Sequence, residues 1–177
     1  MSKSALNPHR LDSLIASVAA GSKDALGELY RAVSPSVYSY ALSITKNGFD
    51  AEDVLHDCFL TVSTHASEYK SDGKPMAWIL TIARNLCFQQ IRREKQRHEI
   101  QSIDLQPVIH TGPEATVEDK MLISACLEHL TPDQRQIVVL HIVAQLKFRE
   151  IAGFLHTPLS TVLSTYYRAL KRMKEFL

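Results

Sequence analysis

Apolar residues in this chain recur at spacings of three and four, which is the period of an α-helix. The first run consists of Leu26, Leu29, Tyr30, Val33, Val37, Tyr40, Ala41 and Ile44. Pro35 interrupts it, and because proline cannot donate a backbone hydrogen bond, the run predicts two helices or one kinked helix. No segment alternates apolar and polar residues as a strand would, so the pattern predicts an all-α fold.

The next predicted helix follows a break at Asn47 and Gly48 and has two distinct faces. Asp50 is placed to cap its N-terminus. The apolar face, which predicts burial, consists of Ala51, Val54, Leu55, Cys58, Phe59 and Val62. The polar face consists of Glu52, Asp53, His56 and Asp57.

A loop over residues 70–75 precedes a long predicted helix that ends in the basic run IRREKQR at residues 91–97. Its apolar side consists of Trp78, Ile79, Ile82, Ala83, Leu86, Cys87 and Ile91. Because Trp78 belongs to this periodic side, a core position is favoured for it over stacking on a base.

Helical periodicity fails over residues 98–118, which contain two prolines and one glycine, and it returns at residue 119. Loops of this length are uncommon unless they are functional or disordered. The pattern therefore divides the chain into a helical module at residues 1–97, an extended linker at 98–118 and a smaller helical module at 119–177.

Helix-start signals subdivide the second module, after a first helix near residues 121–130. Thr131, Pro132 and Gln134 have the form of a capping box with proline at the first helical position. Thr157 and Pro158 repeat the cap signal before the last helix. The residues expected to be buried are Ile137, Val138, Leu140, His141 and Ile142, then Leu159, Val162, Tyr166, Ala169, Leu170 and Met173.

Composition agrees with a globular chain: 45% of the residues are hydrophobic and 22% are charged. No apolar run approaches the roughly 18 residues of a membrane span, and the N-terminus lacks the features of a signal peptide. Cys58, Cys87 and Cys126 are far apart in apolar helical patterns, which is typical of buried thiols in the reducing cytoplasm.

The net charge of +1 hides two basic segments. Residues 61–97 contain 7 Lys and Arg against 3 Asp and Glu, and residues 134–177 contain 7 against 2. Residues 98–133 between them contain 1 against 7. One basic segment alone is typical of a solvated helix, but two at helix ends indicate contact with nucleic-acid phosphates.

No catalytic motif accompanies these segments. The chain has no GxGxxG or GxxxxGK[ST] loop to cradle phosphates and no GxSxG nucleophile turn. His56, Cys58 and His65 could suggest a metal site, but Cys58 falls on the apolar face of its helix and His56 on the polar face. Nothing in the sequence indicates an enzyme, a metal or a cofactor.

Three stretches in fixed order, at residues 21–62, 74–97 and 127–177, carry a resemblance to a known family. They include DAEDVLHDCFL, KPMAWILTIARNLC and LTPDQRQIVVLHIVAQLKFREIAGFLHTPLSTV. Together they resemble the extracytoplasmic-function (ECF) group of sigma-70 family RNA polymerase sigma factors. The resemblance implies a protein without enzymatic activity that binds polymerase core and directs initiation by recognising and melting promoter DNA at −10 and −35 elements.

For the first module, the resemblance implies region two of the family. Its acidic helix would dock on the clamp helices of the largest polymerase subunit, through Asp50, Glu52, Asp53, His56 and Asp57. The loop and the long helix would hold the −10 element, with an unstacked base beside an amide and an aromatic ring and with arginines on phosphates. These implied contacts are Ser71, Asp72, Arg84, Asn85, Phe88, Gln89, Arg92 and Arg93.

For the second module, the resemblance implies region four, a helix–turn–helix that reads the −35 element. The implied contacts are Lys147, Arg149, Ser160, Thr161, Leu163, Ser164, Tyr167, Arg168 and Lys171. Leu163, Thr165 and Leu170 stand where Lys or Arg is frequent in the family, and His156 replaces the usual turn glycine. We therefore expect weak reading of the −35 element, or reading through shape and thymine methyl groups.

Two other functions stay open at this point. A stand-alone helix–turn–helix regulator would bind DNA as a dimer, but residues 20–97 would have no use in it. A degenerate sigma-like protein would only capture an anti-sigma factor, although the basic run at 92–97 disfavours this. The expected partners are polymerase core, promoter DNA and an anti-sigma factor. The chain is expected to be cytoplasmic, outside the membrane and monomeric when free, with modules in several relative orientations.

Overall fold

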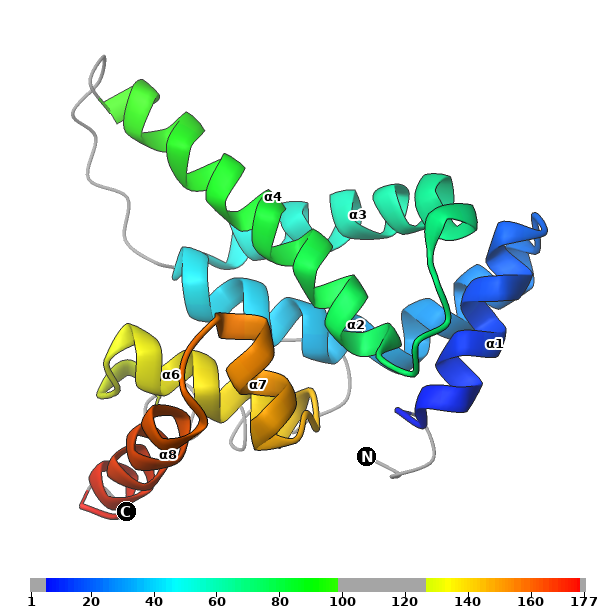
Figure 1. Ribbon diagram of the computed structural model, residues 1–177. Helices are drawn as coiled ribbons and strands as arrows, with labels where there is room; N and C mark the ends of the chain where they lie inside the picture. Colours follow the sequence, from blue (N-terminus) through cyan, green and yellow to red (C-terminus); the bar gives the residue numbers. More distant parts are fainter. Residues whose placement is uncertain (1–5, 99–126, 176–177) are drawn as a thin grey trace.

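The computed structural model describes residues 6–98 and 127–175, and all regular structure within these ranges is helical (Figure 1). The all-α prediction is confirmed. The first module contains α1 (Pro8–Ala19), α2 (Lys23–Thr45), α3 (Gly48–His65), the short 3-10 helix η1 (Ala66–Glu68) and α4 (Pro75–His98). The second contains α6 (Pro132–Val138), the π-helical turn η2 (Val139–Val143), α7 (Phe148–Leu155) and α8 (Leu159–Lys174). The expected linker, apart from His98, and most of the helix expected near 121–130 lie outside the described residues.

Helix α2 is the central element, because it packs on α1, α3 and α4 and also contacts α6 and η2 of the second module (Figure 1). Leu29, Val33, Val37 and Tyr40 on it are fully buried. Pro35 lies inside this single helix, so of the two predicted alternatives, two helices or one kinked helix, the structure has one helix. An internal proline costs a helix about 3 kcal/mol. Packing against several neighbours offsets that cost.

Helix α3 begins as the sequence pattern predicts, but with a different cap. Asn47 is the N-cap, and its side-chain oxygen accepts hydrogen bonds from the backbone N–H groups of Phe49 at 2.9 Å and Asp50 at 3.4 Å. The prediction of Asp50 as the cap is therefore wrong. The predicted apolar face is confirmed, because all six of its residues are buried.

Helix α1 has no counterpart among the predicted helices. Asn7 caps it by accepting a hydrogen bond from the backbone of His9 at 3.0 Å, and Pro8 takes the first helical position. The buried side of α1 consists of Leu11, Leu14, Ile15 and Val18. This spacing is helical, so the signal was present in the sequence.

The capping box at the start of α6 is confirmed. The backbone N–H of Gln134 donates to the Thr131 hydroxyl at 3.3 Å, and the Thr131 N–H donates to the Gln134 side chain at 3.1 Å. Beyond Val138 the backbone widens into the π-helical η2, which changes the phase of the side chains. Ile142, expected to be buried, is consequently 51% exposed.

The two modules share one hydrophobic core. Ser36 on α2 is fully buried and donates its hydroxyl to the carbonyl of Val143 at 3.1 Å. The rings of Tyr40 and Phe154 meet edge-on, with centroids 5.8 Å apart. The expectation that the modules have no fixed relative orientation does not match this arrangement, in which α2 forms a defined contact surface for the second module.

Cys58 and Cys87 are both fully buried between α3 and α4, as predicted, while Cys126 lies outside the described residues. Burial raises the pKa of each thiol to about 12. Within the ranges that the structure describes, no helix is both long enough and apolar enough to cross a membrane.

Candidate nucleic-acid interface

The polar face of α3 exposes three of its four predicted residues, Asp53, His56 and Asp57, while Glu52 is half-buried. Asp50, the fifth residue assigned to polymerase docking, is only 7% exposed. Its carboxylate accepts a hydrogen bond from the Gln90 side chain on α4 at 3.0 Å. Asp50 is therefore a link between α3 and α4, and its assignment to a docking surface is corrected.

Two large apolar side chains that were not among the predicted site residues flank this acidic face. Phe49 is 56% exposed at the start of α3, and Leu60 is 66% exposed three residues after Asp57. Leu60 lies off the buried face of the helix, which is the signal that could have found it. Isolated exposed apolar residues are ordinary. Two that bracket carboxylates on one helix face give that face both charge and exposed apolar area.

The predicted −10 loop is exposed and has a defined shape. Ser71 and Asp72 are both exposed, and the Asp72 carboxylate accepts a hydrogen bond from the backbone N–H of Lys74 at 3.1 Å. Gly73, between Asp72 and Lys74, has a φ of 76°, a conformation that glycine adopts without steric cost. The loop leads directly into α4, whose Trp78 N–H donates to the Lys74 carbonyl at 3.1 Å.

One face of α4 presents most of the predicted −10 residues. Asn85 lies two helical turns after Trp78, and Arg92 lies two turns after Asn85, so the three residues share a face. The exposed residues on and beside this face are Thr81, Asn85, Phe88, Gln89, Arg92 and Arg93. Amide, aromatic and guanidinium groups in one strip can bond a base edge, stack on its plane and hold phosphates.

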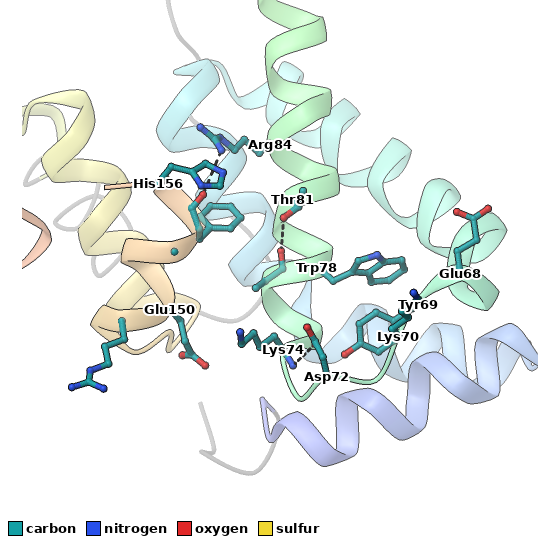
Figure 2. A pocket seen from close by; sticks show the side chains of 14 residues that line it. Glu68, Tyr69, Lys70, Asp72, Lys74, Trp78, Thr81, Arg84, Glu150 and His156 are labelled. Atoms are coloured by element: carbon teal, nitrogen blue, oxygen red, sulfur yellow. Dashed lines mark hydrogen bonds between the residues drawn. The ribbon is translucent and has the colours of Figure 1, made fainter. Parts of the chain in front are cut away.

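Arg84 is held differently from the other arginines. It is half-buried, and its guanidinium carbon lies 5.6 Å from the ring centroid of Phe88 and 5.8 Å from that of Phe154. It also donates to the carbonyl of Phe154 on α7 at 3.5 Å (Figure 2). In this arrangement a predicted phosphate-binding residue contacts the second module.

A cavity of about 690 Å³ separates the start of α4 from α7 (Figure 2). Tyr69, Trp78 and Thr81 line it from the first module, and Glu150 and His156 line it from the second. Trp78 is half-buried against Tyr69, with ring centroids 4.9 Å apart, so it both packs on the core and faces this cavity.

Helices α7 and α8 form the predicted helix–turn–helix. The turn is made by His156, which has a φ of 53° where glycine would be unstrained. The cap prediction for α8 is wrong by one residue: α8 begins at Leu159, Pro158 occupies the N-cap position, and the Thr157 hydroxyl donates back to the Leu155 carbonyl at 3.2 Å. Thr157 thus stabilises the end of α7.

An aromatic cluster fixes the angle between η2, α7 and α8. His141 stacks on Phe148 with centroids 4.1 Å apart, and Tyr166 meets both rings edge-on at 5.1 and 4.9 Å. His141 also bonds the Leu146 carbonyl through Nδ1 at 2.9 Å. Sequence reasoning assigned His141 and Tyr166 to the core but did not foresee this packing, which joins residues from three elements.

The exposed face of α8 is largely uncharged at its front and basic toward its end. Six of the predicted DNA contacts on α8 are exposed: Ser160, Thr161, Ser164, Tyr167, Arg168 and Lys171. Tyr167 is 63% exposed. Leu163 is half-buried at the edge of this face. Lys147 and Arg149 are exposed at the start of α7.

Arg168 is bent back onto its own helix. Its Nε donates to the Ser164 carbonyl at 3.2 Å, and its Nη2 donates to the Thr165 hydroxyl at 3.2 Å. With these donors engaged, Arg168 is better oriented for a phosphate than for two parallel bonds to a guanine edge. Within the described residues, no group of three or more His, Cys, Asp or Glu side chains is placed to hold a metal ion.

Comparison with known families gives two matches that together span most of the chain. Residues 29–97 match the family model for sigma-70 region 2, and residues 120–173 match the model for sigma-70 region 4. The ECF RNA polymerase sigma factor SigK of Mycobacterium ulcerans is 26% identical over 174 residues, which are 94% of this chain and 93% of the relative. The ECF RNA polymerase sigma factor SigM of Bacillus subtilis is 24% identical over 152 residues, covering 84% and 93%.

Two solved structures share the fold. The sigma factor RpoE, solved with the anti-sigma factor NepR from Bartonella quintana, has a TM-score of 0.66 and 23% identity, covering 82% of this chain and 92% of RpoE. CnrH, solved with the cytosolic domain of CnrY, also has a TM-score of 0.66, at 19% identity, covering 94% of this chain and 96% of CnrH. At these identities the likeness concerns the fold.

Proposed function

The chain belongs to the ECF group of the sigma-70 family, and from this premise we propose which of its surfaces performs each step of transcription initiation. As a sigma factor it binds RNA polymerase core and directs initiation at promoters. It acts through binding surfaces rather than by catalysis. We divide these surfaces between a region-two module at residues 1–97 and a region-four module at 119–177, joined at 98–118.

The exposed face of α3 docks on polymerase core. Glu52, Asp53 and Asp57 supply negative charge for a basic helical partner, and His56 lies among them. Leu60 supplies an apolar anchor beside the charges. Carboxylates at such a contact set the rate and orientation of association, while a desolvated apolar residue contributes more of the affinity.

The exposed face of α4, with the loop before it, holds the melted −10 element. Asn85 can bond the edge of an unstacked base and Phe88 can stack on its plane, while Arg92 and Arg93 hold phosphates. Ser71 and Asp72 border this strip from the loop, and Gln89 lies on it. This strip, with cations and rings along one helix face, is the single observation that carries the proposal.

Helix α8 reads the −35 element in the major groove, with Lys147, Arg149, Arg168 and Lys171 on phosphates. Ser160, Thr161, Ser164 and Tyr167 face base edges and sugars, and Leu163 contributes apolar contact. Because the front of α8, residues 159–167, contains no arginine and Arg168 bonds back to its own helix, this reading relies on shape and thymine methyl groups. Footprinting should show little dependence on guanine in the −35 element. Strong guanine dependence would contradict this assignment.

The free chain is a monomer that acts in the cytoplasm, where polymerase and chromosome are, and an anti-sigma factor controls it. Support for such a partner comes from the related proteins RpoE and CnrH, because RpoE was solved with the anti-sigma factor NepR and CnrH with a domain of CnrY.

Run-off transcription of fragmented genomic DNA tests the proposal. Purified polymerase core is used with and without this chain, and new start sites that share two upstream motifs are expected. Stable binding to core without new start sites would favour a sigma-like protein that only captures an anti-sigma factor. Binding to DNA without binding to core would favour a stand-alone helix–turn–helix regulator.

A further inference from the structure

Tyr69 links α1 to the −10 loop. Tyr69 directly follows the last residue of η1 and directly precedes the first residue of the loop. Its hydroxyl donates to the Oδ1 atom of Asp12 on α1 at 2.6 Å. Hydrogen bonds this short are typical of a hydroxyl that donates to an ionised carboxylate, and they are about twice as strong as bonds between neutral groups.

The same tyrosine also touches the far end of the loop. Its ring lies 4.9 Å from that of Trp78, which is in the first turn of α4 (Figure 2). Both rings line the cavity in front of α4, next to Lys74 and Thr81. The two ends of the loop are thus held together by one aromatic pair, and Asp12 holds that pair from α1.

The Asp12 bond is not needed to attach α1 to the protein. Leu11 and Ile15 on the neighbouring positions of α1 are fully buried and supply apolar contact. An exposed ion pair between Arg10 and Glu28, at 3.5 Å, joins α1 to α2 independently. Asp12 is half-buried, where a carboxylate loses hydration and benefits from a hydrogen-bond donor. Its bond to Tyr69 therefore acts on the position of the loop and not on the attachment of α1.

We propose that Asp12 and Tyr69 are positioning residues for −10 recognition, which set the loop at residues 70–74 relative to the reading face of α4. Helix α1, with Asp12, precedes residue 29, where the match to the family model begins, whereas Tyr69 and the loop lie within the match. The inference rests on the proposed function of that face. Burial and the bond to Asp12 raise the pKa of Tyr69, which agrees with a hydroxyl that keeps its proton and donates it to Asp12.

The test compares Tyr69→Phe, Asp12→Ala, Asp12→Asn and the double variant Asp12→Ala/Tyr69→Phe in the full-length chain with polymerase core. Transcription is measured on a promoter taken from the genomic run-off, in two libraries randomised at the −10 or at the −35 element. Core affinity and thermal unfolding are measured in parallel. Glu28→Ala is the matched control, because it breaks the other link from α1 without reaching the loop.

We expect Tyr69→Phe and Asp12→Ala each to lower transcription about tenfold and to weaken base preference at −10, as loss of a bond to a charged group would. Preference at −35 and affinity for core should be unchanged. The double variant should match the single ones, because both remove the same bond. Asp12→Asn should restore most activity, since its amide oxygen still accepts the bond.

Equal loss of −10 and −35 preference, or a loss that follows only the fall in unfolding temperature, would show a purely structural role and overturn the proposal. Variants equal to wild type would overturn it as well, while leaving the proposed function intact. A wild-type chain that starts no transcription with core would instead overturn the proposed function, and this inference with it. If Asp12→Ala does not fold, Tyr69→Phe decides, because it removes a single oxygen atom.

Discussion

At the scale of single residues, two buried phenols have no hydrogen-bond partner among the described residues, Tyr38 and Tyr40. Tyr40 is fully buried between the modules, and burial raises its pKa. A buried hydroxyl without a partner costs about 1–3 kcal/mol. These two tyrosines therefore destabilise the packed arrangement locally, in contrast to Tyr69, whose hydroxyl is bonded.

Removing the hydroxyl oxygen from Tyr40 or from Tyr69 should change the free energy of unfolding in opposite directions. We expect Tyr40→Phe to raise the free energy of unfolding by about 1 kcal/mol, because it removes an unpaired polar group. Tyr69→Phe should lower it by a similar amount, because it breaks the bond to Asp12. Denaturant unfolding measures both. A destabilised Tyr40→Phe variant would mean that the phenol has a bonding partner in solution.

The buried thiols should be inert and should make stability depend on alkaline pH. With pKa values near 12, Cys58 and Cys87 hold their protons in the native state while the unfolded thiols ionise near pH 9. The free energy of unfolding should therefore fall as pH rises from 9 to 12, because only the unfolded chain releases these protons. In a Cys126→Ser background, thiol labelling at pH 8 should require unfolding. Rapid labelling of the native protein would contradict the burial.

At the scale of elements, the hydrogen bond between Asp50 and Gln90 joins α3 to α4. Gln90→Ala would leave a buried carboxylate without its donor, so we expect a loss of about 2 kcal/mol in the free energy of unfolding. The neighbouring Gln89→Ala is a matched variant, since Gln89 is exposed. It should keep full stability and weaken binding to −10 DNA. Equal stability of the two variants would contradict the helix-to-helix link.

The acidic face of α3 gives a second prediction at this scale. Leu60→Ser should weaken binding to polymerase core about tenfold, because an exposed apolar anchor is lost from the contact. Ser63→Ala, on the same helix and also exposed, is the control and should bind as wild type does. Core binding can be measured by fluorescence anisotropy. Unchanged affinity of Leu60→Ser would place the contact elsewhere on the first module.

At the scale of the whole molecule, the packed arrangement cannot read both promoter elements at once. The names of the elements place them about 25 base pairs apart, or roughly 85 Å of duplex at 3.4 Å per step. A compact chain of this length has a radius of gyration of about 16 Å. The modules must therefore separate on the promoter, which breaks the contact between Arg84 and the Phe154 carbonyl.

Small-angle scattering can follow this separation. We expect the free chain to be compact and Ser36→Asp to enlarge its radius of gyration, because a charge beside the Val143 carbonyl cannot remain buried. Ser39→Asp, on the same helix but only half-buried, is the control and should stay compact. An expanded wild-type chain would show that the modules are already apart before polymerase binds.

The helical character, most helix positions and the family resemblance could be inferred from the amino-acid sequence, because these depend on local periodicity, capping residues and motif order. The six buried residues of α3 and the capping box at Thr131 follow from such local rules. The exposed strip of α4 also follows from periodicity, since residues seven apart share a helix face.

Polar groups that meet across distant segments depend instead on how the helices pack in three dimensions. Asp50 bonds Gln90, Asp12 bonds Tyr69, and Arg84 contacts Phe154, at separations of 40, 57 and 70 residues. No local pattern encodes such pairs, because they depend on how the helices cross. The same holds for Ile142, which the π-helical turn moves to the surface, and for the joint core of the two modules, which forms only when α2 is covered on its remaining side.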